Sequence, residues 1–116
     1  MDDNRQYHRI NYIAGGTLQY RDTTFDCQIE NLSMSGALIT IKSKPVFLPG
    51  NICVLKLYDE LVDRQLILET LIAHQASDYA GLVFLNSDAE TQISLEMIIN
   101  RESNLEGAQQ QQYLSN

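Results

Sequence analysis

The sequence contains little cysteine, proline or glycine, and these shortages exclude several classes of protein. Its 116 residues include 2 cysteines, 2 prolines and 6 glycines, which excludes a disulfide-rich scaffold and a collagen-like chain. The hydrophobic share of 44% excludes a wholly disordered chain. A length of this order suits one domain, so we expect a single globular unit.

Basic residues are also scarce. The chain has 8 lysines and arginines against 15 acidic residues, which gives a formal net charge of −7. A chain with this charge does not attract DNA or RNA through a general positive field. An anionic ligand must therefore be held by a local cluster of bases.

Long apolar runs are missing too. No stretch approaches the roughly 18 apolar residues that suggest a membrane span, and the polar residues Met1–Arg9 do not resemble a signal peptide. Cys27 and Cys53 lack the spacing of a metal knuckle. We therefore interpret them as reduced core thiols and expect a cytoplasmic protein.

Groups that could carry catalysis or hold a metal are equally sparse. The only histidines, His8 and His74, lie far apart in the sequence and outside any zinc-ligand spacing. The pair Gly15-Gly16 is not followed by the Gly-Lys-Ser/Thr of a phosphate-binding loop. The sequence thus indicates neither an enzyme nor a protein with a metal or cofactor.

What the sequence does contain is a regular alternation of apolar and polar residues. In Thr24–Glu30, the residues Phe25, Cys27 and Ile29 are apolar and their neighbours polar, as in a strand with one buried face. Similar patterns predict six strands, over residues 11–20, 24–30, 37–41, 52–58, 66–73 and 79–85. Six short strands with tight connections favour a mainly β fold, a closed or nearly closed six-stranded antiparallel barrel.

The sequence also predicts an irregularity in the first strand and the burial of the last one. The pair Gly15-Gly16 predicts a bulge or sharp bend in the first strand. The last strand, Tyr79–Leu85, is apolar nearly throughout, which predicts burial on both of its faces.

Helical periodicity replaces the alternation after Ser87. Ser87 and Glu90 have the spacing of a capping box, and a broad apolar surface follows up to Ile99. We expect a C-terminal α-helix that ends near Arg101 and covers one end of the barrel, or also pairs between two subunits. The domain would then span residues 10–102, with a solvated, flexible tail at 103–116.

Two arginines mark residues 1–9 as a candidate ligand-binding segment. Arg5 and Arg9 lie four positions apart, just ahead of the first predicted strand. A guanidinium group offers planar paired donors to phosphates and guanine edges, and it can stack on a base. An ordinary solvated N-terminus is the alternative interpretation.

A second candidate motif lies at a turn between two predicted strands. Asn31 offers a base edge both an acceptor and a donor, and Ser33 adds a hydroxyl at this exposed turn. Gly36 lets the backbone turn sharply and a ligand approach closely. The alternative is a plain loop of small polar residues.

Together these residues resemble the PilZ domain family, whose signature is Arg-x-x-x-Arg followed by Asp/Asn-x-Ser-x-x-Gly. The segment Tyr79–Phe84 is similar to the family's late strand, and the resemblance spans residues 5–101. It implies a bacterial PilZ-type six-stranded β-barrel with a C-terminal α-helix, whose ligand is cyclic di-GMP. In that family the two arginines bind phosphates and guanines, and the Asx and Ser residues hold a guanine edge. The residues to which these roles carry over are Arg5, Arg9, Asn31, Ser33 and, for the shape of the loop, Gly36.

Two positions depart from the family pattern. Asn31 stands where aspartate is common; a carboxylate can accept from both N–H groups of a guanine edge, whereas an amide has one acceptor oxygen. Many relatives carry a further arginine where this chain has Asn4. We expect binding to persist with reduced affinity, and one ligand molecule per chain.

The sequence leaves three functions open. The first is a receptor or adaptor, monomeric or homodimeric, that passes the level of cyclic di-GMP to a partner protein. The second is a PilZ-type adaptor that binds proteins without nucleotide, and the intact Arg-x-x-x-Arg argues against it. The third is an oligonucleotide-binding barrel, which the net charge of −7 and the lack of clustered exposed aromatic residues disfavour.

Overall fold

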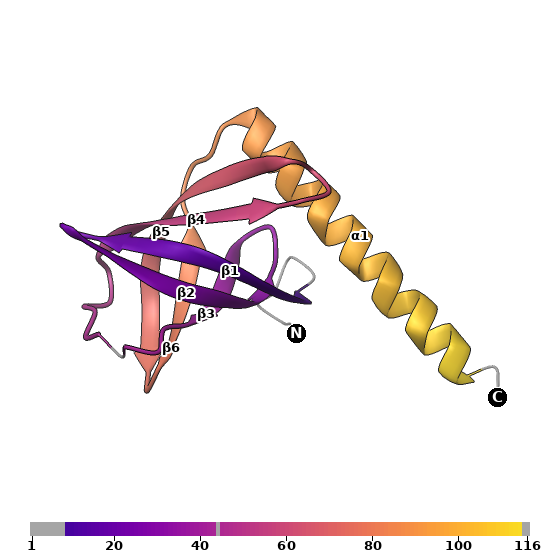
Figure 1. Cartoon of the computed structure of the whole chain (residues 1–116), viewed down its shortest axis with the longest axis horizontal. Coiled ribbons are helices and arrows are strands. Elements are labelled where there is room, and N and C mark those ends of the chain that lie inside the picture. Colours follow the sequence, from indigo (N-terminus) through magenta and orange to yellow (C-terminus); the bar gives the residue numbers. More distant parts are fainter. Residues whose placement is uncertain (1–8, 44, 115–116) are drawn as a thin grey trace.

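The computed structural model describes residues 9–43 and 45–114, which form one closed β-barrel and one long helix (Figure 1). Neighbouring strands run antiparallel around the barrel, in the order β1-β2-β3-β6-β5-β4. The expected six-stranded antiparallel barrel is confirmed. The strands are β1 (Ile10–Tyr20), β2 (Thr23–Leu32), β3 (Gly36–Thr40), β4 (Ile52–Asp59), β5 (Arg64–Ala76) and β6 (Tyr79–Phe84).

The barrel closes because β1 pairs along both of its edges. Leu18 of β1 faces Phe25 of β2 on one side and Leu55 of β4 on the other. Alternate apolar residues of the strands fill the interior, where Leu18 and Leu55 are fully buried. Cys27 and Cys53 are free thiols in this interior, as expected. Burial raises the pKa of the Cys27 thiol to about 12, which keeps it protonated and unreactive.

The irregularity in β1 precedes the pair Gly15-Gly16, so the predicted bulge at that pair is wrong. The register between β1 and β2 shifts between Asn11 and Ala14, and both glycines pair regularly. The shift lies beside Tyr12, whose side chain is buried and whose hydroxyl donates a hydrogen bond to Asp59 at 2.6 Å. A bulge changes the direction in which nearby side chains point, and here the side chain of Tyr12 points inward.

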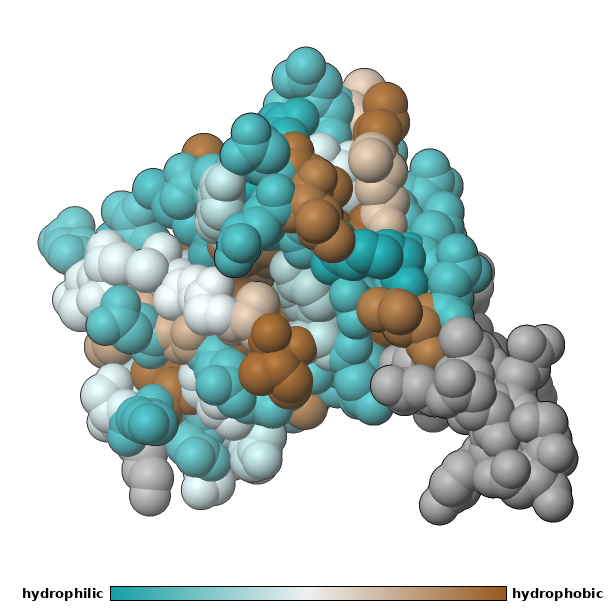
Figure 2. Space-filling view, turned by 45° about the vertical axis from the view of Figure 1, so that its right-hand side comes forward, coloured by the Kyte–Doolittle hydropathy of each residue, from teal (hydrophilic) through white to brown (hydrophobic). Residues whose placement is uncertain are grey.

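The outer face of β6 is largely exposed, so the expectation of two buried faces is wrong. Ala80 and Leu82 point into the barrel, whereas Tyr79 and Val83 are 45% and 43% exposed. A strand of an antiparallel barrel has one interior face, and its other face meets solvent unless another layer covers it. On the face shown in Figure 2, exposed apolar groups form separate brown patches between hydrophilic residues.

Helix α1 (Ala89–Leu114) begins one residue later than the sequence suggested. The backbone amide of Thr91 donates to Oδ1 of Asp88 at 2.8 Å, which makes Asp88 the N-cap. The predicted capping box of Ser87 and Glu90 is therefore wrong. An aspartate caps as well as a serine, because its carboxylate also reaches a free amide of the first turn.

The helix also continues well beyond Arg101, where we expected it to end. Residues 103–114, which we expected to be a flexible tail, are helical and extend away from the barrel (Figure 1). Glutamine, alanine, glutamate and leucine favour a helix there, and one interior glycine, Gly107, costs only about 1 kcal/mol. Among the described residues, no helix is long and apolar enough to cross a membrane.

An ion pair fixes α1 to the end of the barrel where β1 begins and β4 ends. Leu95, Ile98 and Ile99 of the helix are buried, and the helix contacts β1 and β5. Two guanidinium nitrogens of Arg101 donate to the two carboxylate oxygens of Asp59, at 3.0 and 2.9 Å. The Arg101 guanidinium, helped by the other hydrogen bonds to the carboxylate, holds the pKa of Asp59 well below its usual range.

Candidate functional site

The site forms where β1 begins and β2 ends, between residues that are far apart in the sequence. Asn11 of β1 faces Asn31 of β2, and Arg9 immediately precedes β1. Nη1 of Arg9 donates a hydrogen bond to Oδ1 of Asn31 at 2.6 Å. The structure therefore joins one residue of each candidate motif on the outer surface of the barrel. Arg5, the other arginine of the first motif, lies outside the described residues.

A β-bulge in β2 directs Asn31 outward. The register between β2 and β3 shifts between Ile29 and Asn31, so that Glu30 is the additional residue. Ile29 and Leu32 are fully buried, whereas Glu30 and Asn31 are half-buried. Strict alternation would place Asn31 on the inward face with Ile29; the bulge lets Glu30 and Asn31 share the outer face.

A row of outward positions continues from Asn31 across three further strands. Asn31 faces Leu38 of β3, Leu38 faces Gly81 of β6, and Gly81 faces His74 of β5. The His74 ring covers Gly81 so closely that a Cβ there would meet its Nδ1 at 2.6 Å. An apolar side chain thus lies next to Asn31, and a ring lies two strands farther along the same row, on a face where a base could pack. The sequence did not place His74 near the second motif, because this alignment depends on strand register.

Ser33 differs from the expectation of an exposed hydroxyl. Its side chain is 1% exposed, and its Oγ accepts from the amides of Ser35 and Gly36 at 3.1 and 3.2 Å. Its own amide donates to the carbonyl oxygen of Gly36 at 2.9 Å. The hydroxyl therefore holds the β2–β3 turn together, and its contact with a ligand stays a prediction.

Gly36 is required by strand packing at this turn. A Cβ at this position would collide with the carbonyl oxygen of Leu82, because β6 approaches β3 closely there. The positive φ angles among the described residues occur elsewhere, at Arg21, Gly50, Asp63 and Ser77. Gly36 is therefore needed for close contact with β6. The expectation that it permits a sharp turn is not met.

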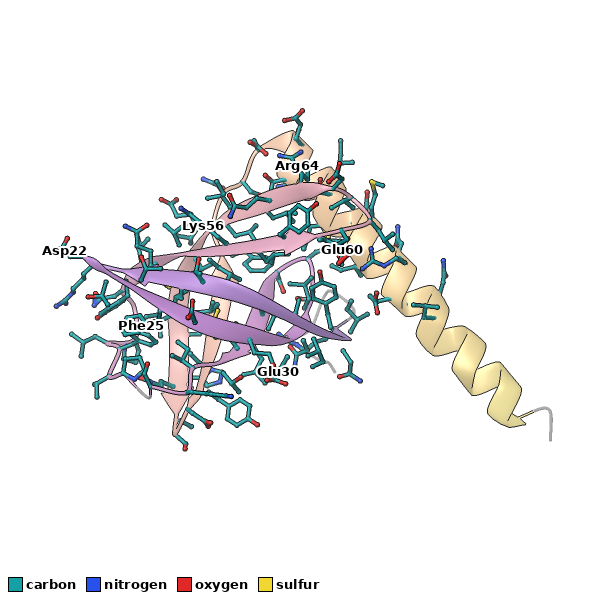
Figure 3. All side chains as sticks on the ribbon, in the orientation of Figure 1. Asp22, Phe25, Glu30, Lys56, Glu60 and Arg64 are labelled. Atoms are coloured by element: carbon teal, nitrogen blue, oxygen red, sulfur yellow. The ribbon has the colours of Figure 1, made fainter. Side chains whose placement is uncertain are left out.

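Glu30, which the sequence did not single out, holds a carboxylate next to this site. Its Oε2 accepts from Nε2 of Gln28 at 2.9 Å and from the Thr40 hydroxyl at 2.8 Å. Gln28 and Thr40 also line a hollow of about 580 Å³ between β2 and the chain that follows β3, together with Phe25. Figure 3 shows Glu30 and Phe25 along the same strand, β2. The site therefore has Arg9 and Asn31 at one end, and at the other end the carboxylate of Glu30 lies beside the hollow.

The part of the chain that the structure describes contains no cluster of metal-ligating side chains, since no three His, Cys, Asp or Glu side chains within it come together as a metal site. The arrangement instead offers planar donors, an amide and a carboxylate on an open strand face. Such groups suit recognition of a phosphate-containing ligand with a base.

Comparisons with known proteins agree with this architecture. The family model described as "PilZ domain" matches residues 3–101. No curated protein sequence matches the chain.

Several solved structures share the fold. The PilZ domain of YcgR from Escherichia coli with c-di-GMP has a TM-score of 0.79 at 12% identity, over 94% of this chain and 98% of that one. The PilZ domain of CeSA from a cellulose-synthesizing bacterium has a TM-score of 0.67 at 20% identity, over 85% and 98%. The Bacillus subtilis inhibitor of motility (MotI/DgrA) has a TM-score of 0.74 at 20% identity, over 89% of this chain and 53% of that one.

Proposed function

Because the chain belongs to the PilZ domain family, we propose that it binds cyclic di-GMP and passes the level of this second messenger to a partner protein. It acts as a receptor or adaptor without catalysis, metal or cofactor of its own. We further propose a cytoplasmic protein, monomeric or homodimeric, that takes neither DNA nor RNA as a partner.

The single observation that carries this proposal is the hydrogen bond between Arg9 and Asn31, at 2.6 Å. It joins the second arginine of Arg-x-x-x-Arg to the first residue of Asn-x-Ser-x-x-Gly, although 22 positions separate them in the sequence. Neither residue is needed for the barrel core, since both lie on the outer surface. The two motifs thus share one surface, as a single binding site requires.

The proposed roles follow the chemistry of each side chain. Arg5 and Arg9 bind the phosphates and stack on or donate to the guanines, because a guanidinium combines positive charge with a planar set of donors. Asn31 holds a guanine edge, and Ser33 and Gly36 keep the β2–β3 turn in the shape that positions Asn31.

The neighbouring structures support the same kind of function. The YcgR domain was solved with c-di-GMP on this fold, and MotI/DgrA is an inhibitor of motility. The alternative is an adaptor that binds its partner without nucleotide. The pairing of Arg9 with Asn31, which brings the two motifs together, favours the nucleotide-binding form.

Isothermal titration with cyclic di-GMP tests the proposal. The parent should bind one nucleotide per chain, and Arg5→Ala or Arg9→Ala should weaken binding about tenfold to a hundredfold, because each removes charge-assisted hydrogen bonds. Arg64→Ala is the matched control: it removes the same charge at an exposed pair with Glu90, in which the closest atoms lie 3.8 Å apart, and should leave affinity unchanged. A folded parent that binds no cyclic di-GMP would favour the nucleotide-free adaptor.

A further inference from the structure

We propose that Glu30 is a specificity-determining residue of this site, whose carboxylate accepts hydrogen bonds from the edge of a guanine. This inference rests on the proposed function, because it assigns a guanine contact within the cyclic di-GMP site. It also assigns to this chain a carboxylate one position before Asn31, where the family's aspartate is replaced by an amide.

The first step is the position of Glu30. As the additional residue of the β2 bulge, Glu30 shares the outer face with Asn31 instead of alternating with it. Figure 3 shows its side chain beside β2, on the strand that carries Asn31. Glu30 therefore adjoins Asn31 along the chain, while its carboxylate reaches toward Gln28 and Thr40, away from Arg9.

The second step is the number of acceptors. The guanine edge presents N–H groups at N1 and at the exocyclic amine, and it needs oxygen acceptors opposite both. Asn31 has a single acceptor oxygen, and Arg9 already donates to it. Asn31 alone is therefore poorly suited to receive both donors.

The third step is the state of the Glu30 carboxylate. Gln28 and Thr40 both donate to Oε2, which fixes the orientation of the group. Within the described part of the chain, no donor is hydrogen-bonded to Oε1. One oxygen is thus held in place and the other remains available to a base edge, as in a pre-organised binding group.

The fourth step is the distribution of charge. A carboxylate repels phosphates, so Glu30 would weaken binding if the phosphates lay against it. Arg9 lies on one side of Glu30 along the strand pair, and the hollow lined by Gln28, Thr40 and Phe25 lies on the other. The phosphates are therefore directed to the arginines, and one guanine to Glu30 at the margin of the hollow.

The test compares cyclic di-GMP with cyclic di-IMP, in which hypoxanthine lacks the exocyclic amine of guanine. Isothermal titration should show that the parent prefers cyclic di-GMP by about tenfold or more, since a hydrogen bond to a charged acceptor is lost with the amine. Glu30→Gln should bind cyclic di-GMP about tenfold more weakly and lose most of that preference. Thr40→Val, which removes one bond that orients Glu30, should reduce the preference in part.

Glu69→Gln provides the charge-matched control, because it removes an exposed carboxylate from β5, a strand that does not line the hollow. It should leave the preference for cyclic di-GMP unchanged. If Glu30→Gln binds cyclic di-GMP as tightly as the parent or more tightly, or keeps the full preference, the inference is overturned while the proposed function stands. If the folded parent binds neither nucleotide, the proposed function fails and the inference with it.

Discussion

Ser33 and Ser35 show, at the scale of single residues, how differently two serines of one turn can be used. The Ser33 hydroxyl is buried and accepts from two backbone amides, whereas Ser35 is exposed and its hydroxyl lies 3.1 Å from that of Ser33. Buried amides that lose their acceptor are costly, and exposed ones can bond to water. Ser33 is thus a residue of the turn as well as of the candidate site.

Replacement of Ser33 should therefore destabilise the fold. Ser33→Ala is expected to lower the free energy of unfolding by about 1–3 kcal/mol, because the amides of Ser35 and Gly36 lose their acceptor. Ser35→Ala should change it by less than about 0.5 kcal/mol. Urea denaturation followed by circular dichroism measures both. Equal stability of the two variants would show that the turn does not depend on the Ser33 hydroxyl.

The sequence predicted Asn31 at a turn between two strands, whereas it lies within β2 and is half-buried, and its orientation depends on the fold. Alternation from Phe25 through Ile29 would place residue 31 inside the barrel, and only the bulge at Glu30 moves it outward. That bulge appears only in the register between β2 and β3, which the pattern along a single strand does not reveal. Glu30 was overlooked for the same reason, because alternation makes it one more outward-facing acid.

At the scale of elements, one buried charge adds an ionic contact to the apolar packing of α1 against the barrel. Asp59 at the end of β4 is 5% exposed, receives two hydrogen bonds from Arg101 and one from Tyr12, and also accepts from the amides of Leu61 and Val62. A carboxylate with so many donors is strongly favoured in its ionised form, which lowers its pKa. The attachment of the helix should therefore depend on pH.

The sign of that dependence follows from the lowered pKa of Asp59. An unfolded aspartate titrates near pH 4, so the native state binds fewer protons than the unfolded state at moderately acidic pH. The stabilisation is fully present above about pH 5 and is lost as the pH falls below about 4, through the native pKa. Asp59→Asn should lower the free energy of unfolding by about 2–3 kcal/mol at pH 7 and by less at pH 3. The loss stays moderate because Arg101 is only partly buried, so that solvent screens the ion pair.

Urea denaturation at both pH values measures this difference. Asp63→Asn, in the same β4–β5 turn, is the control, because Asp63 is exposed and its amide replacement still accepts from the Tyr58 hydroxyl at Oδ1. The control should follow the parent at both values. A cost of Asp59→Asn that is the same at pH 3 as at pH 7 would contradict the ionic attachment of the helix.

The strands could be predicted from alternation to within a few residues, but their ends and irregularities could not. The bulge beside Tyr12 accompanies a hydrogen bond to Asp59, 47 positions away, and nothing in the local pattern reveals it. The helix cap was misplaced by one residue because Ser87 and Asp88 are both good caps. The end of the helix was placed too early because the polar composition after Ser103 suggests a solvated tail, whereas glutamine, alanine and glutamate there also favour helix.

At the scale of the whole molecule, the start of β1 lies between the candidate site and the helix. Arg9 precedes β1 and contacts Asn31, whereas Tyr12, three positions later, contacts Asp59 and through it Arg101 of α1. The site and the helix attachment therefore share one end of the barrel. A partner that reads nucleotide binding would find both features on the same side.

The central claim is that cyclic di-GMP binds the outer face where Arg9 and Asn31 meet. A nuclear magnetic resonance titration, observing the assigned backbone amides of uniformly ¹⁵N-labelled protein, tests it most directly. We predict that chemical shifts change at residues 9–11, 30–38 and 81, that the hairpin tip at Arg21 and Asp22 is unaffected, and that Arg9→Ala abolishes most of the changes at equal nucleotide concentration. Changes confined to other surfaces, or a pattern that Arg9→Ala leaves intact, would contradict the account.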